Sequence, residues 1–362
     1  MPTRNDVSTI GRALRSAGAA AGFMLAQCTD LGVSPDPSPL GVAHDVSAAA
    51  TWTETLLPLP KGAETSNASD VNDNGVVVGS VTIAGMSGSH AVRWKNGHPK
   101  YLDEPPDPTL STIPNAVNNS GMAVGFRTPG VGEPEAVFWK RNGKVTILAG
   151  LPGGFADVAY GVNDAGVIVG QSQNRAARWV DGVVEDLHPP GYAKSRATDI
   201  NAAGDIVGWV EYITGEHRAY IWHADGSQEE LGVLVGDVHS EATGVNDGAN
   251  VVGSSGDLVS TSLAFLWTDA AGIVDALLGI SETHGTDISG SGRIVGYREF
   301  VVNNQLRAVA LTRHNNVLDT LPNSQGVTAR AHAVNLCGTV AGTVETSAGN
   351  RAVVWKQQTC DP

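Results

Sequence analysis

A short segment that recurs seven times constrains the fold of this chain more than any other feature. Its first copy, ASDVNDNGVVVG at residues 68–79, is an apolar run, a polar turn and a second apolar run that ends in glycine. The later copies are AVNNSGMAVG (116–125), GVNDAGVIVG (161–170), DINAAGDIVG (199–208), GVNDGANVVG (244–253), DISGSGRIVG (287–296) and AVNLCGTVAG (333–342). The period of 38 to 46 residues predicts a repeat architecture in which each copy belongs to one structural unit.

The turn inside each copy predicts a β-hairpin. We call its central polar residue the anchor, and the seven anchors are Asn72, Asn118, Asn163, Asn201, Asn246, Ser289 and Asn335. Asn and Asp side chains close such turns, and a glycine three residues after the anchor supplies the positive φ that the turn requires. In the fifth copy Ala249 replaces this glycine, which predicts strain or a different turn type there.

A second signature follows each copy after a variable loop. Its forms are HAVRW (90–94), EAVFW (135–139), RAARW (175–179), RAYIW (218–222), LAFLW (263–267), RAVAL (307–311) and RAVVW (351–355). A polar turn and another short apolar segment come next. Each repeat therefore holds four short strands in about 45 residues, which is the unit of a β-propeller blade.

The two ends of the repeat array complement each other. The last copy stops soon after Trp355 and lacks a fourth strand, whereas residues 51–59 form a strand that precedes the first copy. The Leu59-Pro60 pair at its end resembles Leu321-Pro322, which follows a fourth strand. We therefore predict an all-β, seven-bladed β-propeller with four antiparallel strands per blade, whose ring is closed by the N-terminal strand joining the last blade.

The two signatures together resemble the HAF-type extracellular repeat of bacterial proteins. The resemblance covers roughly residues 66–355, and it departs from the family pattern at Ser289, Leu311 and Ala249. It implies an exported protein that is extracellular, periplasmic or on the cell surface. It implies no fixed activity.

The N-terminal segment has the composition of an export signal. Three arginines within residues 1–15 precede the uncharged run AGAAAGFMLA (17–26), which is too short to span a membrane as a helix. The run ends at Cys28 in a sequence similar to a bacterial lipobox, so we expect residues 1–27 to be a signal and Cys28 to carry lipid. Ordinary cleavage or an unstructured tail is the alternative. Proline-rich residues 28–49 would form a flexible tether, and residues 50–362 the propeller.

Cysteine and charge usage agree with an exported protein. If Cys28 carries lipid, Cys337 and Cys360 remain as an even pair at the same end of the last blade, where they could form a disulfide. Two free thiols are the alternative. The net charge of −14 has no block of like sign, which argues against nucleic acid or an anionic membrane as the main partner.

The catalytic signatures that a single sequence can reveal are absent. There is no G-x-S-x-G, H-E-x-x-H or C-x-x-C segment and no phosphate-binding glycine loop. Residues 70–75 begin like a calcium loop, but the later ligands are missing, so we interpret them as a hairpin turn. We expect no metal and no cofactor.

The tryptophans favour packing over recognition. Six of them share one position of the second signature, which is typical of contacts between blades. Trp209 lies outside that register, at the end of a strand, and is the best candidate for an exposed aromatic residue.

One position of the first strand varies in a way that structure alone does not require. It lies five residues before the anchor and holds Asn67, Ile113, Val158, Arg196, Glu241, His284 and Arg330. It is charged or ionisable only in blades 4 to 7, at the expected channel mouth, and His239 and His332 lie nearby in sequence. Solvated loop ends are the alternative reading. Asp70, Asp199 and Asp287, two residues before their anchors, are expected to bond main-chain amides of the adjacent turn.

These observations leave three hypotheses of function. The first is a binding module whose channel mouth holds a small polar ligand, a glycan or a protein loop through Arg196, His239, Glu241, His284, Arg330 and His332. The second is a hydrolase or lyase that uses His239, Glu241, His284 and Arg330 as acid, base and anion clamp. The third is a purely structural surface protein. In each case we expect a monomer.

Overall fold

The computed structural model describes residues 51–102, 109–130, 132–154, 156–257, 262–277 and 279–357, all within the compact unit formed by residues 48–362. The predicted export signal, the tether and the lipidation site Cys28 lie outside the described residues, as does Cys360. No helix among the described residues is long and apolar enough to cross a membrane.

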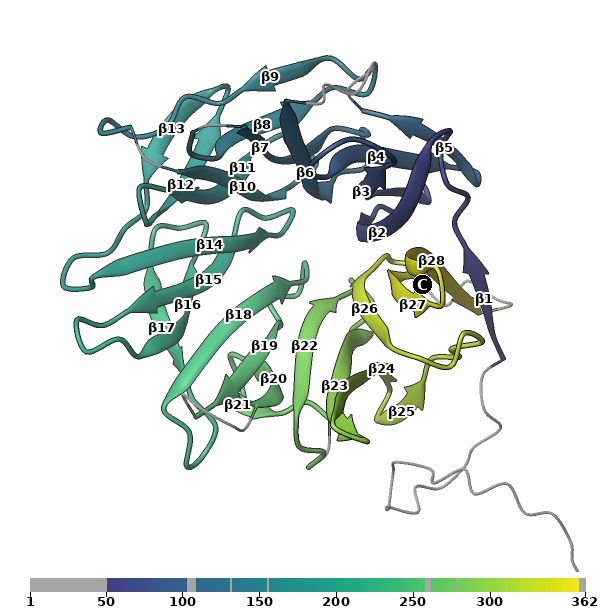
Figure 1. Ribbon diagram of the computed structural model, residues 1–362. Coiled ribbons are helices and arrows are strands. Elements are labelled where there is room, and N and C mark those ends of the chain that lie inside the picture. Colours follow the sequence, from purple (N-terminus) through teal and green to yellow (C-terminus); the bar gives the residue numbers. More distant parts are fainter. Residues whose placement is uncertain are drawn as a thin grey trace, which may run out of the picture. The chain divides into compact units, whose positions relative to one another are not determined.

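The strands of the described residues form seven four-stranded antiparallel sheets, arranged as blades around a central axis (Figure 1). Blade 1 consists of β2 (Ala63–Val71), β3 (Val76–Ile83), β4 (His90–Lys95) and β5 (His98–Tyr101). Blade 2 consists of β6 (Leu110–Val117), β7 (Ala123–Pro129), β8 (Glu135–Trp139) and β9 (Val145–Ile147). Blade 3 consists of β10 (Asp157–Val162), β11 (Ile168–Ser172), β12 (Arg175–Val180) and β13 (Val183–Asp186).

Blade 4 consists of β14 (Lys194–Ile200), β15 (Ile206–Glu211), β16 (His217–Trp222) and β17 (Gln228–Gly232). Blade 5 consists of β18 (His239–Val245), β19 (Val251–Gly256), β20 (Ser262–Thr268) and β21 (Gly272–Asp275). Blade 6 consists of β22 (Thr283–Ile288), β23 (Ile294–Val302), β24 (Gln305–His314) and β25 (Val317–Thr320). Blade 7 consists of β26 (Ala329–Val334), β27 (Val340–Thr346), β28 (Gly349–Gln357) and β1 (Trp52–Leu56). The predicted fold class is therefore confirmed, including the contribution of the N-terminal strand to the last blade.

Ring closure rests on the pairing of β1 with β28. Trp52 lies opposite Gln357 in the antiparallel register, and the Leu57 N–H then donates to the Ala352 carbonyl at 2.8 Å. The carbonyl of Pro58 accepts the indole N–H of Trp94, just as the carbonyl of Pro322 accepts that of Trp355. The counterpart of Leu321-Pro322 is thus Leu57-Pro58, and the sequence comparison with Leu59-Pro60 was wrong by two residues.

The apolar core of the described residues is divided among the spaces between blades. Each of seven buried clusters combines side chains from two neighbouring blades, and one of them joins blade 7 to blade 1. The repeated tryptophans lie in these clusters, with Trp94, Trp139, Trp179 and Trp355 almost fully buried. The prediction that this row packs between blades is confirmed.

The sixth blade solves the same packing problem with an arginine. Ile294 pairs with Arg313, whereas the matching Val251 of blade 5 pairs with Trp267, so Arg313 occupies the tryptophan position. The guanidinium of Arg313 donates to the Ala276 carbonyl of the preceding blade, which replaces an indole N–H bond. The prediction that RAVAL (307–311) ends at the tryptophan position is therefore wrong by two residues.

The hairpin turns follow the predicted chemistry. In the first copy the Asn72 N–H donates to the Val76 carbonyl, and the Gly75 N–H to the Asn72 carbonyl. Ala249 adopts φ 55°, the left-handed conformation that glycine adopts in the other copies, and its N–H makes the same bond to its anchor. Of the two predicted outcomes, the turn type is unchanged and the strain is present, because a residue with a Cβ is disfavoured at positive φ.

Every inner strand contains a β-bulge that the sequence pattern did not reveal. The register shifts between the positions four and two residues before each anchor, for example between Ala197 and Asp199. The constant glycine seven residues after the anchor faces this bulge at very short range. A Cβ on Gly208 would lie 1.9 Å from the carbonyl oxygen of Arg196, so only glycine fits. The bulge re-aims the side chain three residues before the anchor.

Candidate functional site

A cavity of about 550 Å³ occupies the central channel, and residues of all seven inner strands line it. The re-aimed bulge residues are prominent among them and include Tyr160, Thr198, Thr243, Thr286 and His332. Three consecutive threonines bond the next blade, since Thr198 donates to the Ala242 carbonyl at 2.8 Å and Thr243 to the Gly285 carbonyl at 2.9 Å. Much of the channel wall is therefore engaged in holding neighbouring blades together.

His332 takes part in the same system of contacts. Its Nδ1 lies 2.6 Å from the Ala68 carbonyl oxygen of blade 1, so Nδ1 carries the proton and donates it across the ring closure. Burial lowers the pKa of His332, which favours this neutral form. Of the predicted site residues, His332 is the one whose imidazole has a defined structural bond in the channel.

Three buried aspartates encircle the channel in blades 1, 4 and 6. One carboxylate oxygen of Asp199 accepts the N–H of Ile200 and the other accepts the N–H of Val245 in the next blade. Asp70 and Asp287 bond in the same way. The expected bonds to main-chain amides are therefore present, and each aspartate also joins two blades.

Burial raises the pKa of these aspartates despite the amide bonds. The pKa of Asp70 rises to about 6 and that of Asp199 to about 7, and that of Asp287 rises well above its ordinary value. Loss of solvent is the main cause, and mutual repulsion among the carboxylates adds to it.

A second cavity of about 520 Å³ lies between blades 4, 5 and 6, and three of the predicted site residues line it. His239 and Glu241 come from β18, and His284 comes from β22. Thr243 and Thr286 line both this cavity and the central one, so the two spaces adjoin. The structure thus brings together His239, Glu241 and His284, which were predicted from separate repeats.

Glu241 is held by a histidine that the sequence analysis missed. Its Oε1 lies 2.5 Å from Nδ1 of His217, and the other ring nitrogen of His217 lies 3.2 Å from a Glu211 oxygen. The hydrogen bond to Glu241 is the main reason that the pKa of His217 is raised. Within the described residues Oε2 of Glu241 makes no hydrogen bond, so it is available as an acceptor.

Trp209 fixes the ring of His217 by stacking. The two rings are 4.3 Å apart and inclined by 5°, and the tryptophan is only 5% exposed. The prediction of an exposed Trp209 was therefore wrong. β15 continues past Gly208 to Glu211, so Trp209 does not lie at a strand end, and His217 and Arg196 cover its indole.

His239 offers a donor that nothing in the described structure satisfies. Its Nδ1 accepts the main-chain N–H of His217 at 3.1 Å, so the proton must lie on Nε2. That Nε2 is buried without a hydrogen-bond partner among the described residues. A buried donor of this kind costs free energy unless a bound group or water accepts from it.

His284 is surrounded by hydroxyl groups. Its ring stacks on Tyr297 at 4.8 Å, and its Nδ1 lies 3.3 Å from the Ser262 hydroxyl and 3.5 Å from that of Ser254. Burial lowers the pKa of His284, so the imidazole is neutral near pH 7. No bond of its Nε2 occurs within the described residues.

The two predicted arginines flank these cavities without lining them. Arg196 lies between the rings of Tyr160 and Trp209, 5.0 Å from each centroid. Arg330 forms an ion pair with Glu299 at 2.9 Å and lies 5.4 Å from the centre of the Tyr297 ring. Both guanidinium groups support aromatic residues that border the candidate site.

Ser254 and Tyr297, which the sequence analysis missed, share a signal with Trp209. All three stand eight residues after their anchors, directly opposite the varied position on the next strand. In the other blades this position holds Ser80, Phe126, Gln171 and Thr343, so it varies as well. His217 offers no such signal, because it lies in a loop-proximal position whose length differs between repeats.

Comparison with known proteins supports the fold and goes no further. A solved structure of streptogramin B lyase matches with a TM-score of 0.57 and 13% identity, over 85% of this chain and 98% of that one. An acylaminoacyl peptidase from Pyrococcus horikoshii matches with a TM-score of 0.52 and 11% identity, over 83% of this chain and 53% of that one. No family model and no curated protein matches the chain. At these identities the likeness shows a propeller fold alone.

Proposed function

We propose that this chain is a binding module that holds a small polar ligand in the cavity between blades 4, 5 and 6. A glycan or a polar loop of another protein has the same chemistry as such a ligand. The proposal includes export, since the basic N-terminal segment and the similarity to the HAF-type extracellular repeat favour a protein outside the cytoplasm, anchored by lipid at Cys28. A Cys337–Cys360 disulfide would fit the same location; Cys337 lies in the turn between β26 and β27.

The observation that carries this proposal is a set of three polar atoms around one cavity that have no hydrogen-bond partner among the described residues. Glu241 supplies an acceptor, His239 supplies a buried donor, and His284 supplies a second imidazole nitrogen. The cavity volume of about 520 Å³ lies in the range of small-molecule sites. The repeat does not require Glu241 or His284, because their register position holds Ile113 and Val158 in other blades.

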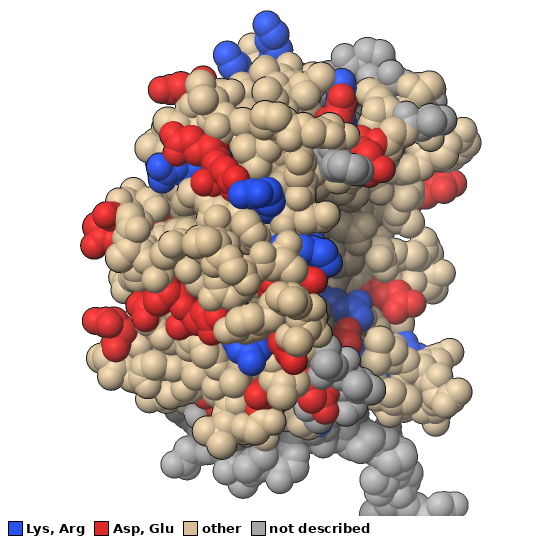
Figure 2. All heavy atoms as spheres, turned by 90° about the vertical axis from the view of Figure 1, so that its left-hand side faces the viewer, with Lys and Arg blue, Asp and Glu red and all other residues tan. Residues whose placement is uncertain are grey.

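Surface charge supports the expectation that nucleic acid is not a partner. Figure 2 shows one side of the molecule, where acidic and basic side chains are interspersed and acidic ones are more numerous. The whole chain carries 37 acidic and 23 basic residues. No broad basic surface for a phosphate backbone is visible on this side.

A hydrolase or lyase is the second candidate, and the surroundings of His284 favour it. A neutral imidazole that contacts two serine hydroxyls can accept a proton from a bound substrate or from a hydroxyl group. Glu241 and His217 would then serve as the second acid–base pair. Turnover of a bound compound, followed by mass spectrometry, would distinguish this candidate from simple binding.

A ligand screen with matched variants tests the proposed site. Glycan and polar-metabolite arrays on the full chain should yield a ligand whose affinity falls at least about 10-fold in Glu241→Gln and in His284→Asn, because each change removes a hydrogen bond to a polar group. Val158→Thr is the control, since Val158 has the same register position in blade 3 and lines neither cavity. A ligand that binds all three variants equally would place the binding site elsewhere.

A further inference from the structure

A third cavity, of about 460 Å³, lies between blades 1 and 2 and has a different character from the candidate site. Three basic side chains line it: Arg93 and Lys95 from β4, and Arg141 from the turn between β8 and β9. Asn74 and Ser120 add polar groups from the anchor turns. Among the described residues no Asp or Glu lines this cavity, although the whole chain carries a net charge of −14.

These three cations lack acidic partners in the part of the chain that the structure describes. Neither Arg93, Lys95 nor Arg141 forms an ion pair with a described carboxylate. Blade 3 shows the contrasting arrangement. There Arg178 has the same strand position as Arg93, one residue before the tryptophan, and it pairs with Glu185 at 2.5 Å. Lys100 takes the place opposite Arg93 that Glu185 takes opposite Arg178.

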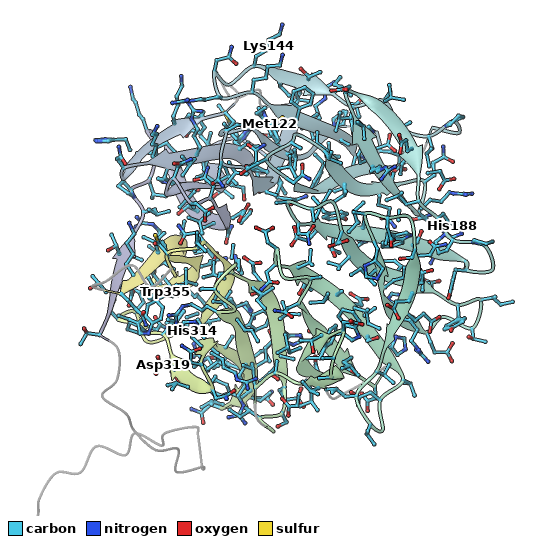
Figure 3. All side chains as sticks on the ribbon, turned by 180° about the vertical axis from the view of Figure 1, so that it is seen from behind. Met122, Lys144, His188, His314, Asp319 and Trp355 are labelled. Atoms are coloured by element: carbon cyan, nitrogen blue, oxygen red, sulfur yellow. The ribbon has the colours of Figure 1, made fainter. Side chains whose placement is uncertain are left out.

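Two adjacent hairpin turns contribute to the basic character, beside Arg93 of β4. The turn of blade 2 reads Lys-Arg-Asn-Gly-Lys (140–144), and Figure 3 shows Lys144 at the outer rim of the ring. The matching positions of blades 3 and 4 are uncharged: Val180 stands where Lys95 stands in blade 1, and Ala224 stands where Arg141 stands in blade 2. The turn geometry therefore does not require a cation at either position.

Two contacts hold the arginines in place before any ligand arrives. Nη1 of Arg93 donates to the main-chain carbonyl of Arg141 at 2.5 Å, which ties blade 1 to the turn of blade 2. The aliphatic stem of Arg141 packs over Gly121, with its Cγ 3.5 Å from the place where a Cβ would stand. A guanidinium has five donors, and within the described residues the other N–H groups of Arg93 and Arg141 make no hydrogen bond, so they can bind a ligand.

We propose that this cavity is an oxyanion site, which binds a phosphate, sulfate or carboxylate group through Arg93, Lys95 and Arg141. Arginine forks match the geometry of such oxygens, and the lysine adds a mobile point charge. The oxyanion is either a free small molecule or a group on an anionic lipid. The site is separate from the cavity between blades 4, 5 and 6 and does not depend on the function proposed for it.

Isothermal titration of the full chain with inorganic phosphate and with sulfate at constant ionic strength tests this site. We expect saturable one-to-one binding that weakens at least about 10-fold in Arg93→Gln and in Arg141→Gln, since each loses a charge-assisted hydrogen bond. Arg178→Gln is the matched control and should bind like the wild type, because its guanidinium is already paired. A parallel arm measures flotation with phosphatidylglycerol vesicles.

The two arms assign the source of the oxyanion. Binding of the free anions without vesicle flotation identifies a soluble ligand, and Arg93-dependent flotation identifies a lipid headgroup. Absence of binding in both arms, or equal loss in Arg178→Gln and Arg93→Gln, would overturn the site. Circular dichroism melts show whether each variant is folded, and Lys95→Gln offers a further change at an exposed side chain.

Discussion

The anchor asparagine does two jobs with one side chain. In Asn246 the side-chain oxygen Oδ1 accepts the main-chain N–H of Asn250 and so closes its own turn. The side-chain Nδ2 donates to the main-chain carbonyl of Ser289 in the next blade at 3.1 Å. Six such links occur among the described residues, and the last joins Asn335 to Asn72 across the ring closure. Only an amide has both an acceptor and a donor in this geometry, which explains why asparagine recurs here.

Ser289 provides the natural exception. Its hydroxyl still accepts the N–H of Arg293 at 3.1 Å, but within the described residues it makes no bond to the Asn335 carbonyl of the next blade, the counterpart of the link that each anchor asparagine makes. We therefore expect Ser289→Asn to complete the ring and to stabilise the protein by about 1 kcal/mol, the net value of one buried hydrogen bond. Urea unfolding measures the change. The reverse substitution, Asn246→Ser, should cost a similar amount, and a Ser289→Asn protein no more stable than the wild type would refute the role assigned to the link.

At the scale of the element, β1 can be tested most directly, because its pairing with β28 closes the ring. Removing residues 52–56 should leave the edge of β28 unpaired and expose part of the blade 7 core, against which Trp52 and Leu56 pack. We expect a fall in melting temperature on the order of 10 °C together with aggregation. Differential scanning calorimetry and light scattering measure both effects.

The control for this deletion keeps the strand and changes only its exposed side chains. Thr53→Ala with Thr55→Ala preserves the main-chain pairing to β28 and should melt close to the wild type. If the deleted protein behaves like this double variant, the N-terminal strand does not close the ring in solution.

The strands and the ring closure could be predicted from the sequence because local patterns that recur in every repeat determine them. The register within a blade could not, since RAVAL at 307–311 matches the repeat by letter while Arg313 takes the tryptophan position by its bond to Ala276. The bulge could not be predicted for a similar reason, because no residue type is specific to it. The glycine that it requires, such as Gly208, also occurs in many other kinds of structure, so its presence does not indicate a bulge.

The candidate site was predicted in part, and the reason is again physical. A position that varies among otherwise uniform blades indicates side chains that structure does not dictate, which found Glu241 and His284. The same reasoning could not separate a free group from a paired one. Arg330 met the criterion equally well, yet it is neutralised by Glu299, and that contact between blades depends on three-dimensional neighbours.

At the scale of the whole molecule, the three channel aspartates should make stability depend on pH. Their pKa values are higher in the folded state than the ordinary value of 3.8, so the folded protein binds more protons. The contribution of each to stability is complete below about pH 4; it is lost as the pH rises through about 6 for Asp70 and about 7 for Asp199. Within that window each carboxyl lowers the free energy of unfolding by up to ~1.4 kcal/mol per pH unit.

Comparing Asp199→Asn with the wild type isolates this effect. The wild type should lose about 2 kcal/mol more than the variant between pH 5 and pH 8, because the variant has no group to titrate at this place. Urea unfolding at the two pH values gives both differences, and any uniform cost of the substitution cancels. Equal losses in the two proteins would show that Asp199 keeps its charge on folding without penalty.

The pairing of Trp52 with Gln357 also bears on how the blades could be ordered in the gene. These residues face each other across one antiparallel ladder, so a hairpin of a few residues could join them and leave blade 7 as an ordinary meander. The chain could then be opened in any exposed loop between blades, giving a circular permutant with the same neighbours throughout. The order of the blades around the axis would be preserved, while the choice of the first blade would be free.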